Sequence, residues 1–255
     1  MKRWFRKLKR PLRWGLLVGL GLPFLGWLFL PWPVAWKWRD PELTSFMKYR
    51  IEQAAEKGES LEIRHDWVPL AQMAPEIPRA VILAEDQRFR QHAGVDWIAL
   101  GEELDYDGEP PFSWTSPSDW AAVVRAVRRG FELRDEVKGR STLTQQLAKN
   151  LYFTPERSLR RKIGEFVVAR RLEWFLDKDR ILELYLNTAE FGPGIFGVEA
   201  ASRAYFGVGA SRLDRTRAAT LAAILPHPLT SNPTRSPGEM AWRRDRILGM
   251  MGGGP

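Results

Sequence analysis

Residues 139–150 read Gly-Arg-Ser-Thr-Leu-Thr-Gln-Gln-Leu-Ala-Lys-Asn. This order predicts a turn followed by a helix, with Thr142 and Gln145 forming a reciprocal capping box at its start. Leucines recur at helical spacing at 143, 147 and 151, which predicts a face turned toward a core. Ser141, Gln145 and Lys149 repeat at the same spacing on roughly the opposite side. Because a surface helix does not need this combination of polar groups, we expect that face to line a ligand site.

The N-terminal part of the chain has the pattern of a membrane anchor. Residues 1–13 form a basic tail, and residues 14–36 carry no charged side chain. That stretch is long enough to cross the roughly 30 Å hydrocarbon core as a helix. Because the basic flank precedes it, we expect a cytoplasmic N-terminus and an exported remainder. A cleaved signal peptide is the alternative, but the apolar run is long for one and no small-x-small cleavage site follows it.

Charge and composition exclude some other classes of protein. The net charge is +8, but seven positive charges precede the apolar stretch, where topology and anionic lipid head groups explain them. No nucleic-acid motif accompanies them, so we expect no nucleic-acid partner. The chain has no cysteine, which excludes disulfides and thiol chemistry. Its three histidines are scattered and predict no metal site.

The rest of the chain is predicted to be mainly α, because strand-like alternation is scarce. We expect a connecting segment at 37–69, one domain at 70–235 and a C-terminal tail at 236–255. The region at 102–117 is acidic and contains proline, so it reads as a loop. Helices are predicted over 78–89, 119–134, 156–176, 178–187, 198–206 and 214–225.

Three further stretches carry polar side chains in suggestive patterns. Residues 84–96 read Ala-Glu-Asp-Gln-Arg-Phe-Arg-Gln-His-Ala-Gly-Val-Asp, and 157–165 read Arg-Ser-Leu-Arg-Arg-Lys-Ile-Gly-Glu. In the second, Arg157, Arg161 and Glu165 share one helix face. Residues 180–187, Arg-Ile-Leu-Glu-Leu-Tyr-Leu-Asn, precede a glycine-punctuated turn. Taken singly, an adjacent Glu-Asp or an Arg161–Glu165 pair is more often a solvated surface feature.

Taken together and in order, these motifs resemble those of the peptidoglycan glycosyltransferases. This family comprises the transglycosylase domains of class A penicillin-binding proteins and their monofunctional relatives. The 139–150 run resembles the family's Gly-Gly-Ser-Thr-Ile-Thr-Gln-Gln and departs from it at Arg140. Residues 85–96 match Glu-Asp-x-x-Phe-x-x-His-x-Gly-x-Asp, and 161–165 match Arg-Lys-x-x-Glu. The resemblance covers about residues 70–235, and no transpeptidase domain follows, which points to the monofunctional branch.

The resemblance implies a lysozyme-like, mainly α glycosyltransferase domain with a membrane-proximal jaw, preceded by one transmembrane helix. It implies an enzyme that polymerises lipid II into β-1,4-linked glycan strands and releases undecaprenyl diphosphate. The growing lipid-linked strand is the donor and lipid II the acceptor, and the displacement inverts configuration. Glu85 is the implied general base, and Glu165 the second essential carboxylate, near the donor phosphates.

The same resemblance implies the substrate contacts and the setting. No cofactor is required, although Glu165 beside a diphosphate leaves a role for Mg²⁺ or Mn²⁺ open. The implied partners are the bilayer and other cell-wall synthesis and division proteins. The implied location is the inner membrane, as a single-pass protein with a periplasmic catalytic domain. The implied substrate-binding residues are Asp86, Arg125, Ser141, Gln145, Gln146, Lys149, Arg157, Arg161 and Asn187.

Two other functions remain as alternatives. A muramidase or lytic transglycosylase of the same fold would also use two carboxylates. The basic residues Lys149, Arg157 and Arg161 argue against it, because a glycan without a diphosphate gives them nothing to bind. A non-catalytic scaffold for cell-wall synthesis is disfavoured by the presence of both Glu85 and Glu165. We also hypothesise that Trp114 and Trp120 enter the bilayer, the alternative being that they pack on the core.

Overall fold

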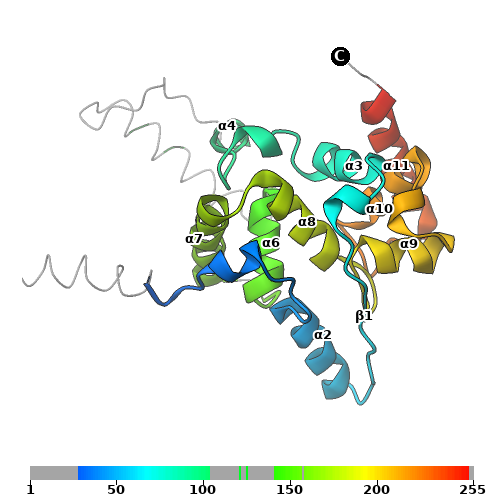
Figure 1. Cartoon of the computed structure of the whole chain (residues 1–255), viewed down its shortest axis with the longest axis horizontal. Helices are drawn as coiled ribbons and strands as arrows, with labels where there is room; N and C mark the ends of the chain where they lie inside the picture. The colour runs from blue at the N-terminus through cyan, green and yellow to red at the C-terminus, as the bar shows by residue number, and fades with distance from the viewer. Residues whose placement is uncertain (1–27, 104–120, 122–124, 126–140, 157, 253–255) are drawn as a thin grey trace, which may run out of the picture.

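A computed structural model of the chain describes residues 28–103, 121, 125, 141–156 and 158–252. The described part is mainly α, as predicted, with one small sheet (Figure 1). The α-helices are α2 (Ser45–Glu56), α3 (Glu76–Glu85), α4 (Trp97–Glu103), α6 (Leu143–Tyr152), α7 (Leu159–Phe175), α8 (Lys178–Thr188), α9 (Val198–Phe206), α10 (Arg215–Ile224) and α11 (Pro237–Gly252). Short 3₁₀ helices are η1 (Pro33–Lys37), η2 (Leu70–Gln72), η3 (Phe89–Gln91) and η4 (Ala210–Arg212).

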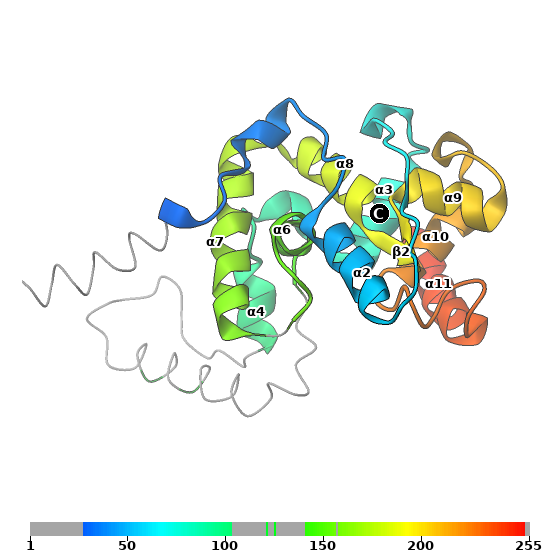
Figure 2. The ribbon, with the colours of Figure 1, turned by 90° about the horizontal axis from the view of Figure 1, so that it is seen from below.

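Helix α6 lies at the centre of one half of the molecule. It packs against α7, α8 and α2, while α10 packs against α3 and α11 at the other end. Figure 2 shows α7 on one side of the molecule and α9, α10 and α11 gathered on the opposite side. Leu143, Leu147 and Leu151 are buried, which confirms the predicted core face of α6. Each such side chain contributes roughly 1.5–3 kcal/mol of burial free energy.

The start of α6 is capped as its sequence predicted. Thr142 Oγ1 accepts a hydrogen bond from the Gln145 backbone N–H at 3.2 Å, and Gln145 Oε1 accepts one from the Thr142 N–H at 3.2 Å. Thr142 Oγ1 also donates to the Gly94 carbonyl at 2.6 Å. The cap therefore both begins the helix and fixes it against the chain before α4.

The helix predicted at 78–89 ends earlier than expected. Helix α3 stops at Glu85, and η3 follows only at Phe89. Between them the backbone leaves the helical conformation at Asp86 (φ −160°, ψ 77°). The Asp86 side chain accepts a hydrogen bond from the Leu143 N–H at the start of α6. This break leaves Glu85 at the C-terminal end of α3.

A three-stranded sheet joins the two ends of the fold. Strand β3 (Ile195–Phe196) pairs in parallel with β1 (Arg64–His65) and antiparallel with β2 (Glu190–Gly192). The chain then turns into α9 at Gly197, which has φ +82°. A Cβ on Gly197 would lie 2.7 Å from the Asn187 carbonyl oxygen, so only glycine fits this turn.

Both segments that flank the expected domain take part in the fold. The predicted connecting segment 37–69 contains α2, which packs on α6. The predicted C-terminal tail at 236–255 is a wrong assignment, because α11 packs on α3 and α10. Met240, Ile247 and Met251 recur seven and four residues apart, so they share the helix face that is buried.

Most of the predicted membrane anchor and of the predicted jaw lies outside the described residues. Of the expected span at 14–36, the structure describes residues 28–36, where Leu28 and Phe29 are helical and η1 begins at Pro33. Among the residues described, none of the helices has both the length and the apolar character needed to cross a membrane. Trp114, Trp120 and the 119–134 helix lie outside the description, apart from residues 121 and 125.

Candidate active site

Glu85 and Gln146 meet where the end of α3 approaches α6. Gln146 Nε2 donates to Glu85 Oε2 at 2.9 Å and to the Ser141 carbonyl at 3.1 Å. Burial raises the pKa of the Glu85 carboxyl, because the charged form loses water. The Gln146 hydrogen bond and the charge of Lys149 act in the opposite direction. A carboxylate with a raised pKa and one fixed donor is suited to accept a proton.

Tyr185 of α8 determines how the Gln146 amide is oriented. Its hydroxyl donates to Gln146 Oε1 at 2.9 Å, so the amide nitrogen must face Glu85. Tyr185 is 1% exposed, and burial raises its pKa well above the ordinary value, which keeps it a donor. The sequence analysis quoted the motif that contains Tyr185 but did not select the residue. Its position two residues before Asn187 in that motif was the available signal.

Asp86 is buried and anchors the end of α3 to the start of α6. Its carboxylate accepts from the Leu143 N–H at 3.0 Å and lies 2.9 and 3.0 Å from His92 Nε2. The side chain is buried, so its negative charge stabilises the first turn of α6 from inside the protein. Asp86 thus joins α3 to α6, and its predicted contact with substrate stays a prediction.

Asp86, His92 and Asp96 form a group of metal-ligating side chains within the described residues. Their candidate ligand atoms lie within 4.8 Å of one another. Asp96 is paired with Arg88 through two bonds of 2.8 and 3.0 Å, and Asp86 is occupied by His92 and Leu143. Both carboxylates of this group are therefore already bonded to other groups of the protein.

Glu165 is the second carboxylate of the site. It is 2% exposed, accepts a hydrogen bond from Arg161 Nη1, and lies 3.4 Å from Lys162 Nζ. The shared face of Arg161 and Glu165 is confirmed, but the alternative of an exposed surface pair is wrong because Glu165 is buried. Lys162 Nζ also donates to Ser141 Oγ at 2.7 Å. Lys162 is the second residue of the Arg-Lys-x-x-Glu motif, but it is not among the site residues predicted from the sequence.

These contacts join the two carboxylates in one network. Glu165 pairs with Lys162, Lys162 with the Ser141 hydroxyl, and Gln146 links the Ser141 carbonyl to Glu85. Three helices therefore supply the network: α3, α6 and α7. Five of the residues selected from the sequence are brought together here: Glu85, Ser141, Gln146, Glu165 and, through its bond to Glu165, Arg161.

Lys149 lies beside this network on α6. Its ammonium is 5.8 Å from the centre of the Phe46 ring and, among the described residues, makes neither a hydrogen bond nor an ion pair. Burial lowers the pKa of Lys149, while the charges of Glu165 and Glu85 act to raise it. A partly desolvated cation without a committed partner can bind an anionic ligand.

The remaining selected residues divide into buried supports and residues at or beyond the edge of the described part of the chain. Gln145 commits its amide oxygen to the α6 cap. Asn187 is fully buried, and its amide binds both the N–H and the carbonyl of Val68 at 2.9 Å; its predicted contact with substrate stays a prediction. Arg125 is exposed, and its neighbours 122–124 and 126–140 lie outside the described residues, as does Arg157.

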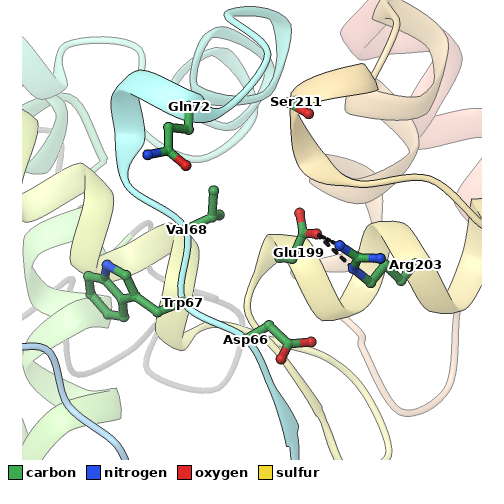
Figure 3. A pocket seen from close by; sticks show the side chains of 7 residues that line it. All are labelled: Asp66, Trp67, Val68, Gln72, Glu199, Arg203 and Ser211. Atoms are coloured by element: carbon green, nitrogen blue, oxygen red, sulfur yellow. Dashed lines mark hydrogen bonds and ion pairs between the residues drawn. The ribbon is translucent and has the colours of Figure 1, made fainter.

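A pocket of about 600 Å³ lies elsewhere, between the segment before α3 and helix α9 (Figure 3). Figure 3 shows Glu199 and Arg203 facing each other from α9, with Gln72 and Val68 on the other side. None of the residues selected from the sequence lines it. The Glu85–Glu165 network is therefore separate from this pocket.

The chain is similar to known proteins over most of its length. The family model described as Transglycosylase matches residues 52–106 and 111–252. A protein of Herminiimonas arsenicoxydans is 36% identical over 247 residues, which cover 96% of each chain. One of Azoarcus sp. (strain BH72) is 40% identical over 244 residues, covering 94% of this chain and 95% of the relative. One of Chromobacterium violaceum is 37% identical over 215 residues, or 84% of each chain.

All three relatives carry the name biosynthetic peptidoglycan transglycosylase. The matched range of the family model contains α3, α6, α7 and α8, and with them the Glu85–Glu165 network. It also extends to residue 252 and so includes α11, which agrees with the packing of that helix. The chain therefore belongs to the Transglycosylase family and is a glycosyltransferase enzyme.

Proposed function

We propose that the protein polymerises lipid II into β-1,4-linked glycan strands and releases undecaprenyl diphosphate, with Glu85 as general base. The observation that carries this proposal is the Glu85 carboxyl itself, whose pKa is raised by burial and which faces a fixed Gln146 donor. Such a group is suited to take a proton from the acceptor. The membership of the family supports the peptidoglycan substrate class.

The proposed reaction is a single displacement at the anomeric carbon of the donor. The acceptor 4-hydroxyl loses its proton to Glu85 as its oxygen forms the new bond to that carbon. The bond from the carbon to the diphosphate oxygen breaks, and the electron pair leaves on the diphosphate. Attack from the face opposite an α-linked leaving group produces the β-linkage without a covalent enzyme intermediate.

Three cations are available to the leaving diphosphate. Lys149 is uncommitted within the described residues, while Arg161 and Lys162 are held in place by Glu165. Fixed positive charge stabilises the negative charge that develops as the bond breaks. Glu165 acts in this proposal as the anchor for two of these cations. The proposal requires no cofactor, so removal of divalent cations with EDTA should leave polymerisation intact. Loss of activity that Mg²⁺ or Mn²⁺ restores would show that the reaction needs a divalent cation.

The proposal includes an inner-membrane location with the catalytic domain in the periplasm. The apolar stretch at 14–36 after the basic residues 1–13 supports this orientation. The bilayer would then supply both lipid-linked substrates to the site, and other cell-wall synthesis and division proteins are the expected partners. Carbonate extraction of membranes and protease accessibility in spheroplasts test it. A protein released by carbonate would contradict the anchor.

The decisive experiment uses the detergent-solubilised full chain and labelled lipid II. Wild type should form glycan chains, and Glu85→Gln should form none because it lacks the base. The matched control is Glu239→Gln, at an exposed glutamate of α11, which should polymerise like wild type. If the wild type cut preformed glycan and ignored lipid II, a hydrolase or lytic transglycosylase would replace the polymerase. Inactivity on both substrates would favour the scaffold.

A further inference from the structure

A third buried carboxylate pairs with an arginine that shares an aromatic neighbour with Lys149, and the proposed mechanism does not use it. Glu190, the first residue of β2, is 6% exposed. Arg50 of α2 binds both of its oxygens, from Nε to Oε1 at 2.8 Å and from Nη2 to Oε2 at 2.8 Å. The remaining Arg50 nitrogen donates to Gln53 Oε1 at 2.8 Å. This bidentate geometry is the strongest form of a carboxylate–arginine pair.

The ring of Phe46 brings this pair into the neighbourhood of Lys149. The Arg50 guanidinium carbon is 5.0 Å from the ring centre, and Lys149 Nζ is 5.8 Å from the same centre. An edge contact with Phe196, at 6.2 Å between ring centres, holds the Phe46 ring. Two cations and one carboxylate thus gather around one aromatic side chain, where α2 packs on α6.

The two cations differ in what they bind. Arg50 is fully committed to Glu190 and Gln53, whereas the Lys149 ammonium has no ion pair among the described residues. Burial raises the pKa of Glu190, and the hydrogen bond and charge of Arg50, followed by the charge of Lys149, act against that rise. A buried carboxylate deprived of its partner is strongly unfavourable and seeks another cation.

We infer that Arg50 is a positioning residue for the diphosphate end of the site: by occupying both oxygens of Glu190, it keeps the Lys149 ammonium uncommitted for the substrate. This inference rests on the proposed function, because it assigns Lys149 to the diphosphate. Without Arg50, the Glu190 carboxylate turns to Lys149 and neutralises it. The removal of Glu190 as well should then free Lys149 again.

The test is a double-mutant cycle in the full chain, measured at mildly alkaline pH, where the Glu190 carboxylate is ionised. Arg50→Met should raise KM for lipid II about tenfold, the effect of one lost contact to a charged group, with a smaller change in kcat. The single variant Glu190→Gln should have a KM near that of wild type. Lys149 keeps its charge in this variant, and no carboxylate competes with the substrate for it. The double variant Arg50→Met/Glu190→Gln should return KM to within about threefold of wild type, as expected for coupled neighbours.

Two controls separate this effect from a loss of folding. Arg217→Met removes an arginine from the exposed Arg217–Asp214 pair on α10 and should leave KM unchanged. Arg50→Lys keeps one charge but cannot span both carboxylate oxygens, so its KM should lie between those of wild type and Arg50→Met. Thermal melting of every variant shows which of them remain folded.

Binding of undecaprenyl diphosphate in detergent micelles gives a readout without turnover. It should weaken in Arg50→Met and recover in the double variant. If the double variant binds as weakly as Arg50→Met, or if Arg50→Met binds like wild type, the inference is overturned while polymerase activity stands. If the wild type binds the diphosphate with this pattern but does not polymerise lipid II, the proposed function fails and the positioning role stands. A wild type that neither binds nor polymerises overturns both.

Discussion

At Glu85, burial and hydrogen bonding act on the carboxyl group in opposite directions. Burial raises its pKa, whereas Gln146 and Lys149 lower it by stabilising the carboxylate. A general base must be deprotonated, so activity falls as the pH drops through the pKa of Glu85. The acidic limb of kcat/KM should accordingly lie above the ordinary pKa of a glutamate.

Gln146→Leu removes the hydrogen bond that favours the charged form of Glu85. The pKa of Glu85 should rise further, and the acidic limb of kcat/KM should move to higher pH. Initial rates with labelled lipid II over an acidic to neutral series measure the shift. Gln91→Leu, at an exposed glutamine, should leave the limb in place. An unmoved limb in Gln146→Leu would assign it to a different group.

Asp86→Ala tests the buried anchor between α3 and α6. The substitution leaves the Leu143 N–H and His92 Nε2 without their acceptor. Because such buried donors lose their partners, the free energy of unfolding should fall by about 2–4 kcal/mol. Urea denaturation followed by circular dichroism measures it, with the exposed Asp245→Ala as the matched control. A loss no larger than that of the control would show that Asp86 is dispensable for stability.

At the scale of the elements, the turn between β3 and α9 is built on a single glycine. Gly197 has φ +82°, and a Cβ there would lie 2.7 Å from the Asn187 carbonyl oxygen. The same Asn187 holds the Val68 backbone through its side chain. The end of α8, the turn into α9 and the segment before α3 therefore depend on one another.

Gly197→Ala should destabilise the protein by about 1–3 kcal/mol, from backbone strain and the close contact with Asn187. Gly249→Ala is its matched control, because a Cβ there meets nothing within 4 Å and the residue lies inside α11. That variant should gain up to about 1 kcal/mol, as alanine favours a helix. Thermal unfolding compares the two. Equal melting temperatures would contradict the assigned role of Gly197.

At the scale of the whole molecule, α11 closes the end of the fold opposite α7. It packs on α3, whose last residue is Glu85, and on α10 (Figures 1 and 2). The C-terminal helix thus supports the element that positions the proposed base.

Ile247→Ala should lower the free energy of unfolding by about 2–5 kcal/mol, because it leaves a cavity at a side chain that is 5% exposed. Ile163→Ala in α7 makes the same chemical change at a side chain that is 57% exposed and should have a much smaller effect. Guanidinium denaturation measures both. If Ile247→Ala lowers the free energy of unfolding by as little as Ile163→Ala does, α11 contributes little to the core.

The sequence by itself determined the features that are encoded within one or two helical turns. The capping box of Thr142 and Gln145 joins residues three apart, and the leucine stripe of α6 repeats every four. Such local hydrogen bonds and periodicities depend only on the geometry of the helix. For the same reason the sequence predicted a mainly α chain and the shared face of Arg161 and Glu165.

Only the tertiary structure decided which of those polar residues reach one another. Gln146 and Glu85 are 61 residues apart, Asn187 and Val68 are 119, and Arg50 and Glu190 are 140. Tyr185 and Arg50 were not selected from the sequence, because nothing in their own segments indicates their distant partners. The packing of α11 and the burial of Asp86 and Asn187 likewise follow from how the helices meet. Contacts at such separations depend on the packing of whole elements, which no local pattern specifies.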